Sequence, residues 1–240
     1  MQQRKLFAIL ALIGLVAAPS LARGGRNGNE TRFTVRVENI TMKDAFTASN
    51  GVKWSFALSP GLWVAHGNDV ILFKEGKPAS KDLEMQAEDG DPSGLAKMLE
   101  AQHHVGHGVF STPVGASSPG PIRPGDAYEF VVTAKPGMKL TMTMMFGQSN
   151  DWFYAPEKPI DLFGKSGKPV SGDLTSKFVL CDAGTEKDEE LGIGPNQGPR
   201  QKAVNTGEDE HGVVHRVKGS PFSSNNAELF RITITPEEKM

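Results

Sequence analysis

Two short segments of the chain place carboxylate side chains next to apolar runs. The first is S-N-D-W-F-Y-A-P at residues 149–156, and the second is C-D-A-G-T-E at residues 181–186. Asp182 and Glu186 are four residues apart around a glycine, which lets the chain turn tightly enough for both carboxylates to face one point. Ca²⁺ takes several oxygen ligands from carboxylates and carbonyls, so Asp182 and Glu186 are candidate metal ligands. Both segments, including Asp151 in the first, place their carboxylates just past an expected strand end, where the loops of a sandwich cluster. On spacing alone, solvated loop charge is the commoner explanation.

Aromatic residues lie beside the first carboxylate. Trp152, Phe153 and Tyr154 follow Asp151 directly, and we expect them to be partly buried under the site. An exposed contact patch for a glycan, lipid or protein is the alternative. Arg200, in a glycine- and proline-rich loop over 192–200, is a possible partner for the carboxylates or for an anionic ligand.

The histidines offer a metal site of a different kind. Two of them are four residues apart, which suits zinc when both lie on one helix. Glycines at positions 106 and 108 argue against a helix there, and no H-E-x-x-H arrangement is present. We therefore expect solvated or capping histidines rather than a zinc site. The residues concerned are His66, His103, His104 and His107.

Nucleophilic catalysis has little support in the sequence. The serines at 111, 117 and 118 lack a G-x-S-x-G context, and no glycine-rich phosphate loop is present. Cys181 is the only cysteine, so the chain forms no internal disulfide, and its apolar neighbours predict a buried, unreactive thiol. We expect a protein that is not an enzyme. A metal-dependent hydrolase that uses the same carboxylates is the alternative.

The N-terminal residues predict export. Arg4 and Lys5 precede an apolar run over residues 6–18, and small residues follow it at the spacing of a signal-peptide cleavage site. We expect residues 1–22 to be a signal peptide and residues 23–31 a flexible leader. An uncleaved N-terminal anchor helix is the alternative. After cleavage the chain is expected not to be transmembrane, and to be periplasmic or secreted.

The charge of the mature chain restricts the classes of partner that it is expected to bind. Removal of residues 1–22 takes away two cations and leaves a formal net charge of −4. This mild acidity gives no footprint for nucleic acid and no polybasic patch for an anionic membrane. We expect an extracellular or envelope partner that is a protein, a glycan or a lipid. The remaining length suits one domain, residues 32–240.

Short apolar segments separated by turn signals predict an all-β fold, an antiparallel β-sandwich. One stretch, residues 81–101, contains good helix formers broken by D-G-D-P, and we expect one or two short helices there with Leu95, Met98 and Leu99 facing the core. The expected strands lie near residues 33–40, 54–64, 70–73, 128–134, 140–146, 177–181 and 227–235, with a break in the second at Ser59-Pro60-Gly61.

Five segments, in order along the chain, resemble the spondin domain, a module of animal extracellular matrix proteins that also occurs in exported bacterial proteins. The similarity covers residues 33–235, nearly the whole mature chain. The segments are F-T-V-R-V-E-N-I-T at 33–41, L-S-P-G-L-W-V-A-H-G at 58–67, S-N-D-W-F-Y-A-P at 149–156, V-L-C-D-A-G-T-E at 179–186 and G-I-G-P-N-Q-G-P-R-Q at 192–201.

The resemblance implies a C2-like β-sandwich with one calcium ion at one end. It also implies that Asp151, Asp182 and Glu186 are the ligands. The chain departs from the animal pattern at Glu186, where the relatives have Asp, and at Cys181, where they tend to have Trp. With the resemblance, we expect an exported calcium-binding adhesion or binding module of the spondin type.

Overall fold

The computed structural model describes residues 30–67, 70–102 and 106–237. The expected signal peptide, most of the expected leader, and both His103 and His104 lie outside these ranges. None of the helices in the described ranges is long and apolar enough to cross a membrane. The described chain is mostly antiparallel sheet with a few short helices, so the expected all-β sandwich is confirmed.

The described strands form a four-stranded sheet, a seven-stranded sheet and a small pair, β2–β3. The order is β10-β13-β1-β6 in the first and β12-β11-β8-β7-β4-β5 in the second, where β9 also pairs with β7. The strands are β1 Thr31–Asn39, β2 Phe46–Thr47, β3 Lys53–Trp54, β4 Leu58–His66, β5 Gly106–Phe110, β6 Ala127–Ala134, β7 Lys139–Phe146, β8 Trp152–Pro156, β9 Ile160–Asp161, β10 Gly172–Asp173, β11 Phe178–Asp182, β12 His215–Arg216 and β13 Phe230–Pro236.

The two large sheets face each other across a hydrophobic core. In β1 the buried residues Phe33, Val35 and Val37 alternate with more exposed ones, which is the period of two expected of a strand with one solvated face. From the seven-stranded sheet, Met142 and Met144 of β7 belong to the same core cluster. This packing fixes both sheets, and therefore the loops at their ends.

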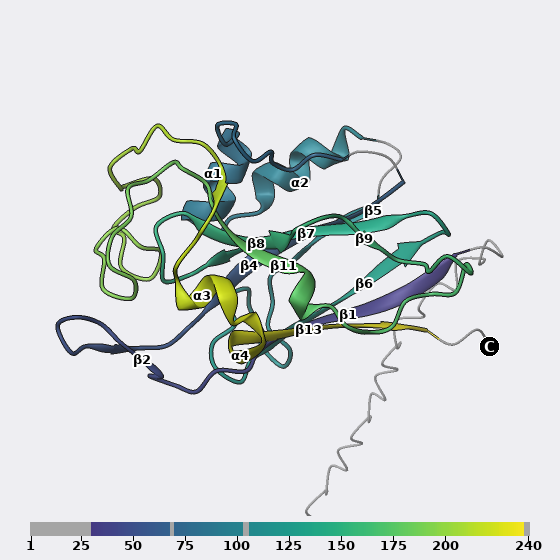
Figure 1. Ribbon diagram of the computed structural model, residues 1–240, viewed down its shortest axis with the longest axis horizontal. Helices are drawn as coiled ribbons and strands as arrows, with labels where there is room; N and C mark the ends of the chain where they lie inside the picture. The colour runs from purple at the N-terminus through teal and green to yellow at the C-terminus, as the bar shows by residue number, and fades with distance from the viewer. Residues whose placement is uncertain (1–29, 68–69, 103–105, 238–240) are drawn as a thin grey trace, which may run out of the picture.

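Two helices, over residues 81–88 and 93–100, cover the outer face of the seven-stranded sheet (Figure 1). Two short helices and the break between them confirm the prediction for residues 81–101, and Leu95 and Leu99 are buried against this face while Met98 is half-buried. Strand β8 is consequently buried along its whole length. The helical segments are α1 Lys81–Glu88, α2 Ser93–Glu100, the 3₁₀ turn η1 Thr175–Lys177, α3 Pro221–Ser224 and α4 Asn226–Leu229.

The break predicted at Ser59-Pro60-Gly61 is wrong, because these residues lie inside β4, where its register with β7 shifts. Ser59 Oγ accepts a hydrogen bond from Met145 N at 2.9 Å, in place of a carbonyl of the neighbouring strand. A Cβ on Gly61 would lie 2.2 Å from Thr143 O, so only glycine fits this close approach. Proline and glycine here mark a β-bulge rather than a turn.

Three further expectations need correction. Residues 70–73 are not a strand; they cross the outer face, where the Phe73 ring packs edge-on against Phe153 at 5.0 Å. Residues 152–156, which were not among the expected strands, form β8, whose burial on both faces removes the alternating pattern of an exposed strand. Residues 227–229 belong to α4, so the last strand begins later than expected.

Candidate metal centre

The turn between β7 and β8 is built by the S-N-D-W segment. Ser149 Oγ accepts a hydrogen bond from Trp152 N at 3.1 Å and closes the turn. Asn150 Oδ1 accepts from Glu189 N at 3.0 Å and ties the turn to the loop that follows β11. Asp151, between them, is fully buried with 0% exposure. Asp151 was expected just past a strand end. It lies in the turn that follows β7 and immediately precedes β8.

Only one of the two carboxylate oxygens of Asp151 has protein partners. Oδ2 accepts hydrogen bonds from Thr185 N at 2.7 Å, Thr185 Oγ1 at 3.0 Å and Glu186 N at 3.1 Å. Oδ1 is buried and has no hydrogen-bond partner among the described residues. Burying a carboxylate oxygen without a partner costs free energy, so a cation or a hydrogen-bond donor at this atom would stabilise the fold.

Asp182 is the last residue of β11 and is held from two sides. Its Oδ1 accepts a hydrogen bond from Gly184 N at 2.7 Å, and its Oδ2 accepts one from Trp152 Nε1 at 3.0 Å. Gly184 has φ of +68°, and a Cβ there would lie 2.6 Å from Val213 N. This position requires glycine on both grounds, and the tight turn directs Asp182 toward Asp151.

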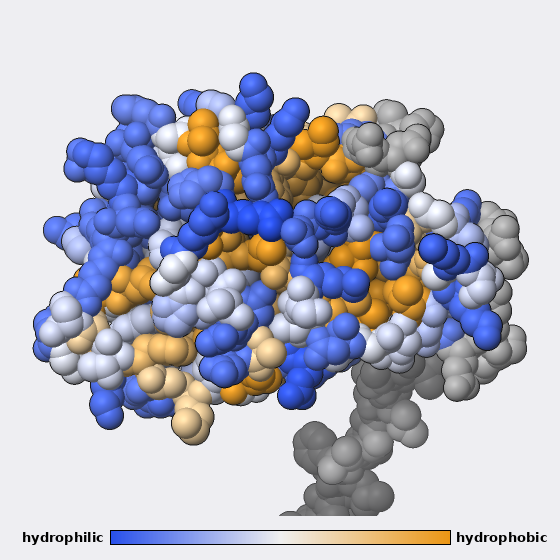
Figure 2. Space-filling model, viewed as in Figure 1, coloured by the Kyte–Doolittle hydropathy of each residue, from blue (hydrophilic) through white to orange (hydrophobic). Residues whose placement is uncertain are grey.

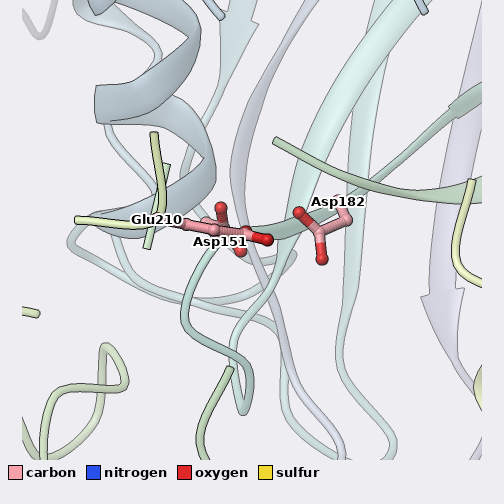
Figure 3. A group of neighbouring side chains, drawn as sticks. All are labelled: Asp151, Asp182 and Glu210. Carbon is pink, nitrogen blue, oxygen red and sulfur yellow. The ribbon is translucent and has the colours of Figure 1, made fainter. Parts of the chain in front are cut away.

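A third carboxylate joins these two. Glu210 N donates to Thr185 O at 2.9 Å, and this backbone pairing brings the segment before β12 beside the turn after β11. Asp151, Asp182 and Glu210 each offer one oxygen, and the three oxygens lie within 4.8 Å of one another. Figure 3 shows the three carboxylates close to one another; Asp151 and Asp182 are buried and Glu210 is exposed.

Glu210 was missed by the sequence analysis. It lies 28 residues after Asp182, beyond a long loop rich in glycine and proline. The only available signal was the acidic run at 208–210 next to Gly212, whose N–H donates to Gly184 O at 2.7 Å. Such runs are usually solvated, so nothing in the sequence separates Glu210 from its two acidic neighbours.

Glu186 is placed differently from the expected ligand role. It is buried, and it is not one of the three carboxylates that converge. Its Oε1 accepts a hydrogen bond from Gly207 N at 2.7 Å and its Oε2 accepts one from Asn150 Nδ2 at 3.2 Å. Glu186 therefore joins the loop before Glu210 to the turn that carries Asp151.

The surroundings of these carboxylates oppose their ionisation. Burial, and then the charge of Asp182, raise the pKa of Asp151 to about 7 in spite of the hydrogen bonds to Oδ2. Burial also raises the pKa of Asp182, and the charge of Asp188 adds to that effect. His215 offers little positive charge to offset these carboxylates, because it lies on the surface and its Nε2 is 3.9 Å from Asp182 Oδ2.

A further carboxyl group lies deeper in the same region. Glu88, at the end of α1, is buried and its Oε2 has no hydrogen-bond partner. Burial raises its pKa to about 8, although a hydrogen bond with the Thr185 side chain opposes the shift and the charge of Glu186 adds to it. At neutral pH this group is therefore mostly protonated and adds little negative charge to the centre.

The geometry fits a hard divalent cation. The donors are all carboxylate oxygens, the type that Ca²⁺ prefers, and Asp151 also has a buried oxygen, Oδ1, without a hydrogen-bond partner among the described residues. Oxygens that share one Ca²⁺ at about 2.3–2.6 Å lie within about 5 Å of each other, which agrees with the 4.8 Å spread. A divalent charge would also replace the mutual repulsion of the carboxylates by attraction.

The aromatic residues after Asp151 are core residues. Trp152 has 9% exposure, and Phe153 and Tyr154 have 0%, so the alternative of an exposed contact patch is wrong. Cys181 is fully buried as expected, and burial raises the pKa of its thiol to about 12. Arg200 hydrogen-bonds to Gly194 O at 2.8 Å and to two glutamine side chains, Gln148 and Gln197, rather than to the converging carboxylates.

Within the described residues, no histidine belongs to a group of side chains that could hold a metal ion. The group whose ligand atoms lie within 4.8 Å of one another consists of Asp151, Asp182 and Glu210. His66 is buried and its Nε2 lies 3.1 Å from Thr141 Oγ1. His107 is in β5, which agrees with the expectation that no helix continues there.

No protein-family model matches this chain, and no curated protein matches it either.

Proposed function

We propose that this protein is an exported, spondin-type binding module whose loops are organised by one Ca²⁺, and that it is not an enzyme. The ion would be held by Asp151, Asp182 and Glu210. The observation that carries the proposal is the convergence of their oxygens within 4.8 Å, with Asp151 Oδ1 buried and without a partner. The resemblance of the S-N-D-W and D-A-G-T-E segments to the spondin domain supports it independently.

The arrangement suits an ion that shapes a binding surface. Asp151 and Asp182 are anchored to backbone and indole donors, whereas Glu210 lies at the surface. Bound Ca²⁺ would join the turn before β8, the end of β11 and the segment before β12. The surface of these loops would then meet a protein, glycan or lipid outside the cell. Glu186 would act indirectly, since it fixes the loop that leads to Glu210.

The sharpest test is the response of stability to calcium in the wild type and in Asp151→Asn. The amide oxygen of asparagine can replace Oδ2 and keep its three hydrogen bonds, while the amide NH₂ takes the place of the unpartnered Oδ1. The variant therefore removes charge without removing a protein contact. The matched control is Glu208→Gln, which removes an exposed charge two residues from Glu210 that pairs with Lys187.

Thermal and denaturant unfolding should each be followed in chelator and in millimolar calcium. A ligand that binds only the folded state stabilises it by about 2.7 kcal/mol at a hundredfold excess over its Kd. We expect this shift in the wild type and in Glu208→Gln, and its loss in Asp151→Asn. Asp151→Asn should also be more stable than the wild type in chelator. Equal calcium shifts in all three proteins, or none in the wild type, would reject the site.

A metal-dependent hydrolase is the second candidate, and one observation favours it. His215 Nε2 lies 3.9 Å from Asp182 Oδ2 at the solvent-facing side of the group, where a general base would be needed. This candidate predicts metal-dependent hydrolysis of ester or phosphoester probes that His215→Gln abolishes while calcium-dependent stabilisation persists. The binding module predicts no such activity.

A further inference from the structure

A second candidate site lies away from the carboxylate group, where an open cleft of 1020 Å³ runs beside β9. In Figure 1 β9 lies at the other end of the sandwich from the loops around residues 190–210. The cleft is bordered by the turn between β8 and β9 and by the segment from 163 to 177 that leads through η1. Figure 2 shows hydrophobic surface below β9, with hydrophilic residues around it.

The floor of the cleft is apolar and well supported. It includes Ile160, Phe163, Val170 and Leu174, which are buried or half-buried. The Phe163 ring packs edge-on against Phe33 of the core at 5.5 Å, so the floor is continuous with the sandwich. The residues after Phe163 form a tight hairpin, with Gly164 N donating to Lys168 O at 2.8 Å, and this hairpin makes one wall.

Three exposed lysines border this floor: Lys158, Lys165 and Lys177. None of the three forms an ion pair within 4.0 Å in the part of the chain that the structure describes. A rim of three ammonium groups that form no ion pair with the described residues is complementary to a ligand with several negative charges.

The carboxylates of the same cleft are already engaged. Glu157 pairs with Arg216 at 2.9 Å, and Asp161 pairs with Lys139 at 3.6 Å. Asp173 accepts a hydrogen bond from Thr175 N at 2.7 Å. Their charges are therefore partly compensated by their own neighbours, and the lysines are the groups left to meet a ligand.

We infer that this cleft binds an acidic oligosaccharide, whose sugar rings pack on the apolar floor while its carboxylate or sulfate groups meet the three lysines. Sugar rings combine apolar faces with hydroxyl groups, and Ser171 and Ser176 in the cleft offer hydroxyl partners for them. This site does not depend on calcium or on the proposed function.

Two other anionic partners fit less well. An extended acidic peptide would add to a sheet edge through its backbone, but the strands beside the cleft, β9 and β10, are two residues long. An anionic bilayer presents a flat surface, whereas the apolar floor here lies in a hollow between two walls.

The test uses binding of a short oligogalacturonate to the mature protein at low salt. We compare the wild type with the triple variant Lys158→Ala, Lys165→Ala and Lys177→Ala. The matched control is Lys43→Ala, Lys53→Ala and Lys97→Ala, which makes the same change of charge at exposed lysines outside the cleft. Each exposed ion pair changes affinity by about 1.4-fold to fivefold, so the cleft variant should lose on the order of tenfold and the control about twofold or less.

Three results would overturn the inference. These are no binding of oligogalacturonate by the wild type, equal losses in the two triple variants, and binding of a neutral maltooligosaccharide as tight as that of the acidic one. Tighter binding of a glutamate-rich peptide or of anionic phospholipid vesicles would assign the cleft to that partner instead. Melting temperatures equal to that of the wild type establish that each triple variant is folded.

Discussion

The molecule carries two concentrations of charge that differ in how they are held. At the end of β11, Asp151 and Asp182 have 0% and 4% exposure, and hydrogen bonds fix one or both of their oxygens. Beside β9, Lys158, Lys165 and Lys177 are all exposed and form no ion pair within the described residues. The first group is fixed inside the fold, and the second lies exposed at its surface.

This difference separates two kinds of recognition. Charges held close together in a site of low dielectric interact strongly, so their pKa values shift and a small cation of one geometry is favoured. Exposed lysines interact weakly and are screened by salt, so they favour an extended anion without demanding one geometry. The carboxylate group should therefore control stability, whereas the lysine cleft should affect binding alone.

The largest expected effect is the pH dependence of stability in chelator. The folded pKa of Asp151 is raised to about 7 from an ordinary value near 4, so the folded chain binds this proton more tightly than the unfolded chain. The stabilising effect of protonation is complete below pH ~4 and is lost as pH rises through ~7. The shift corresponds to a loss of up to about 4 kcal/mol in the free energy of unfolding.

Denaturant unfolding at a series of pH values measures this loss. In saturating calcium the decline should be smaller, because the cation favours the ionised form. In Asp151→Asn the part of the decline due to Asp151 should be absent. A wild type whose stability in chelator is flat between pH 4 and 7 would show that burial and the charge of Asp182 do not raise the pKa of Asp151 in the folded state.

A smaller effect is expected from Glu186→Gln, which separates a structural carboxylate from the ion ligands. The glutamine oxygen can still accept from Gly207 N, but its NH₂ then faces the Asn150 Nδ2 donor. We expect a loss of about 1–3 kcal/mol in the free energy of unfolding that is already present in chelator. A loss of calcium affinity with unchanged stability in chelator would instead make Glu186 a ligand.

The smallest effect is expected at the lysine cleft. Surface substitutions usually change the free energy of unfolding by less than about 0.5 kcal/mol, and Lys165→Ala should do the same. Calcium removal should shift the unfolding midpoint of Lys165→Ala by the same amount as that of the wild type. A destabilisation comparable to that of Glu186→Gln would show that the cleft lysines are part of the folded framework, and the contrast between the two regions would fail.

Patterns with one solvated face were readable from the sequence. The alternation of Phe33, Val35 and Val37 predicted β1, and the D-G-D-P interruption predicted one or two short helices. Strand β8 was missed because Trp152 to Pro156 is buried on both faces and shows no alternation. The Ser-Pro-Gly segment in β4 was misread, because its proline and glycine serve a bulge against Thr143 and Met145.

The candidate site was only partly predictable. On spacing alone, solvated loop charge was the commoner explanation for Asp151 and Asp182, and it was the resemblance of their segments to the spondin domain that predicted one shared site. Glu210 reaches them only through the backbone pairing of residues 184–187 with 208–212, a contact between distant parts of the chain. Glu186 looked equivalent to Asp182 in the sequence, and its separate role depends on Gly207 and the turn before β8.

Terbium luminescence tests the calcium centre most directly. Tb³⁺ binds oxygen ligands as Ca²⁺ does, and Trp152, whose Nε1 lies 3.0 Å from Asp182 Oδ2, is placed to sensitise its emission. We expect emission excited through tryptophan to saturate at one ion per chain, to fall when calcium is added, and to be unchanged in Glu208→Gln. Asp151→Asn should abolish it. No sensitised emission in the wild type, or equal emission in Asp151→Asn, would contradict a metal centre at Asp151, Asp182 and Glu210.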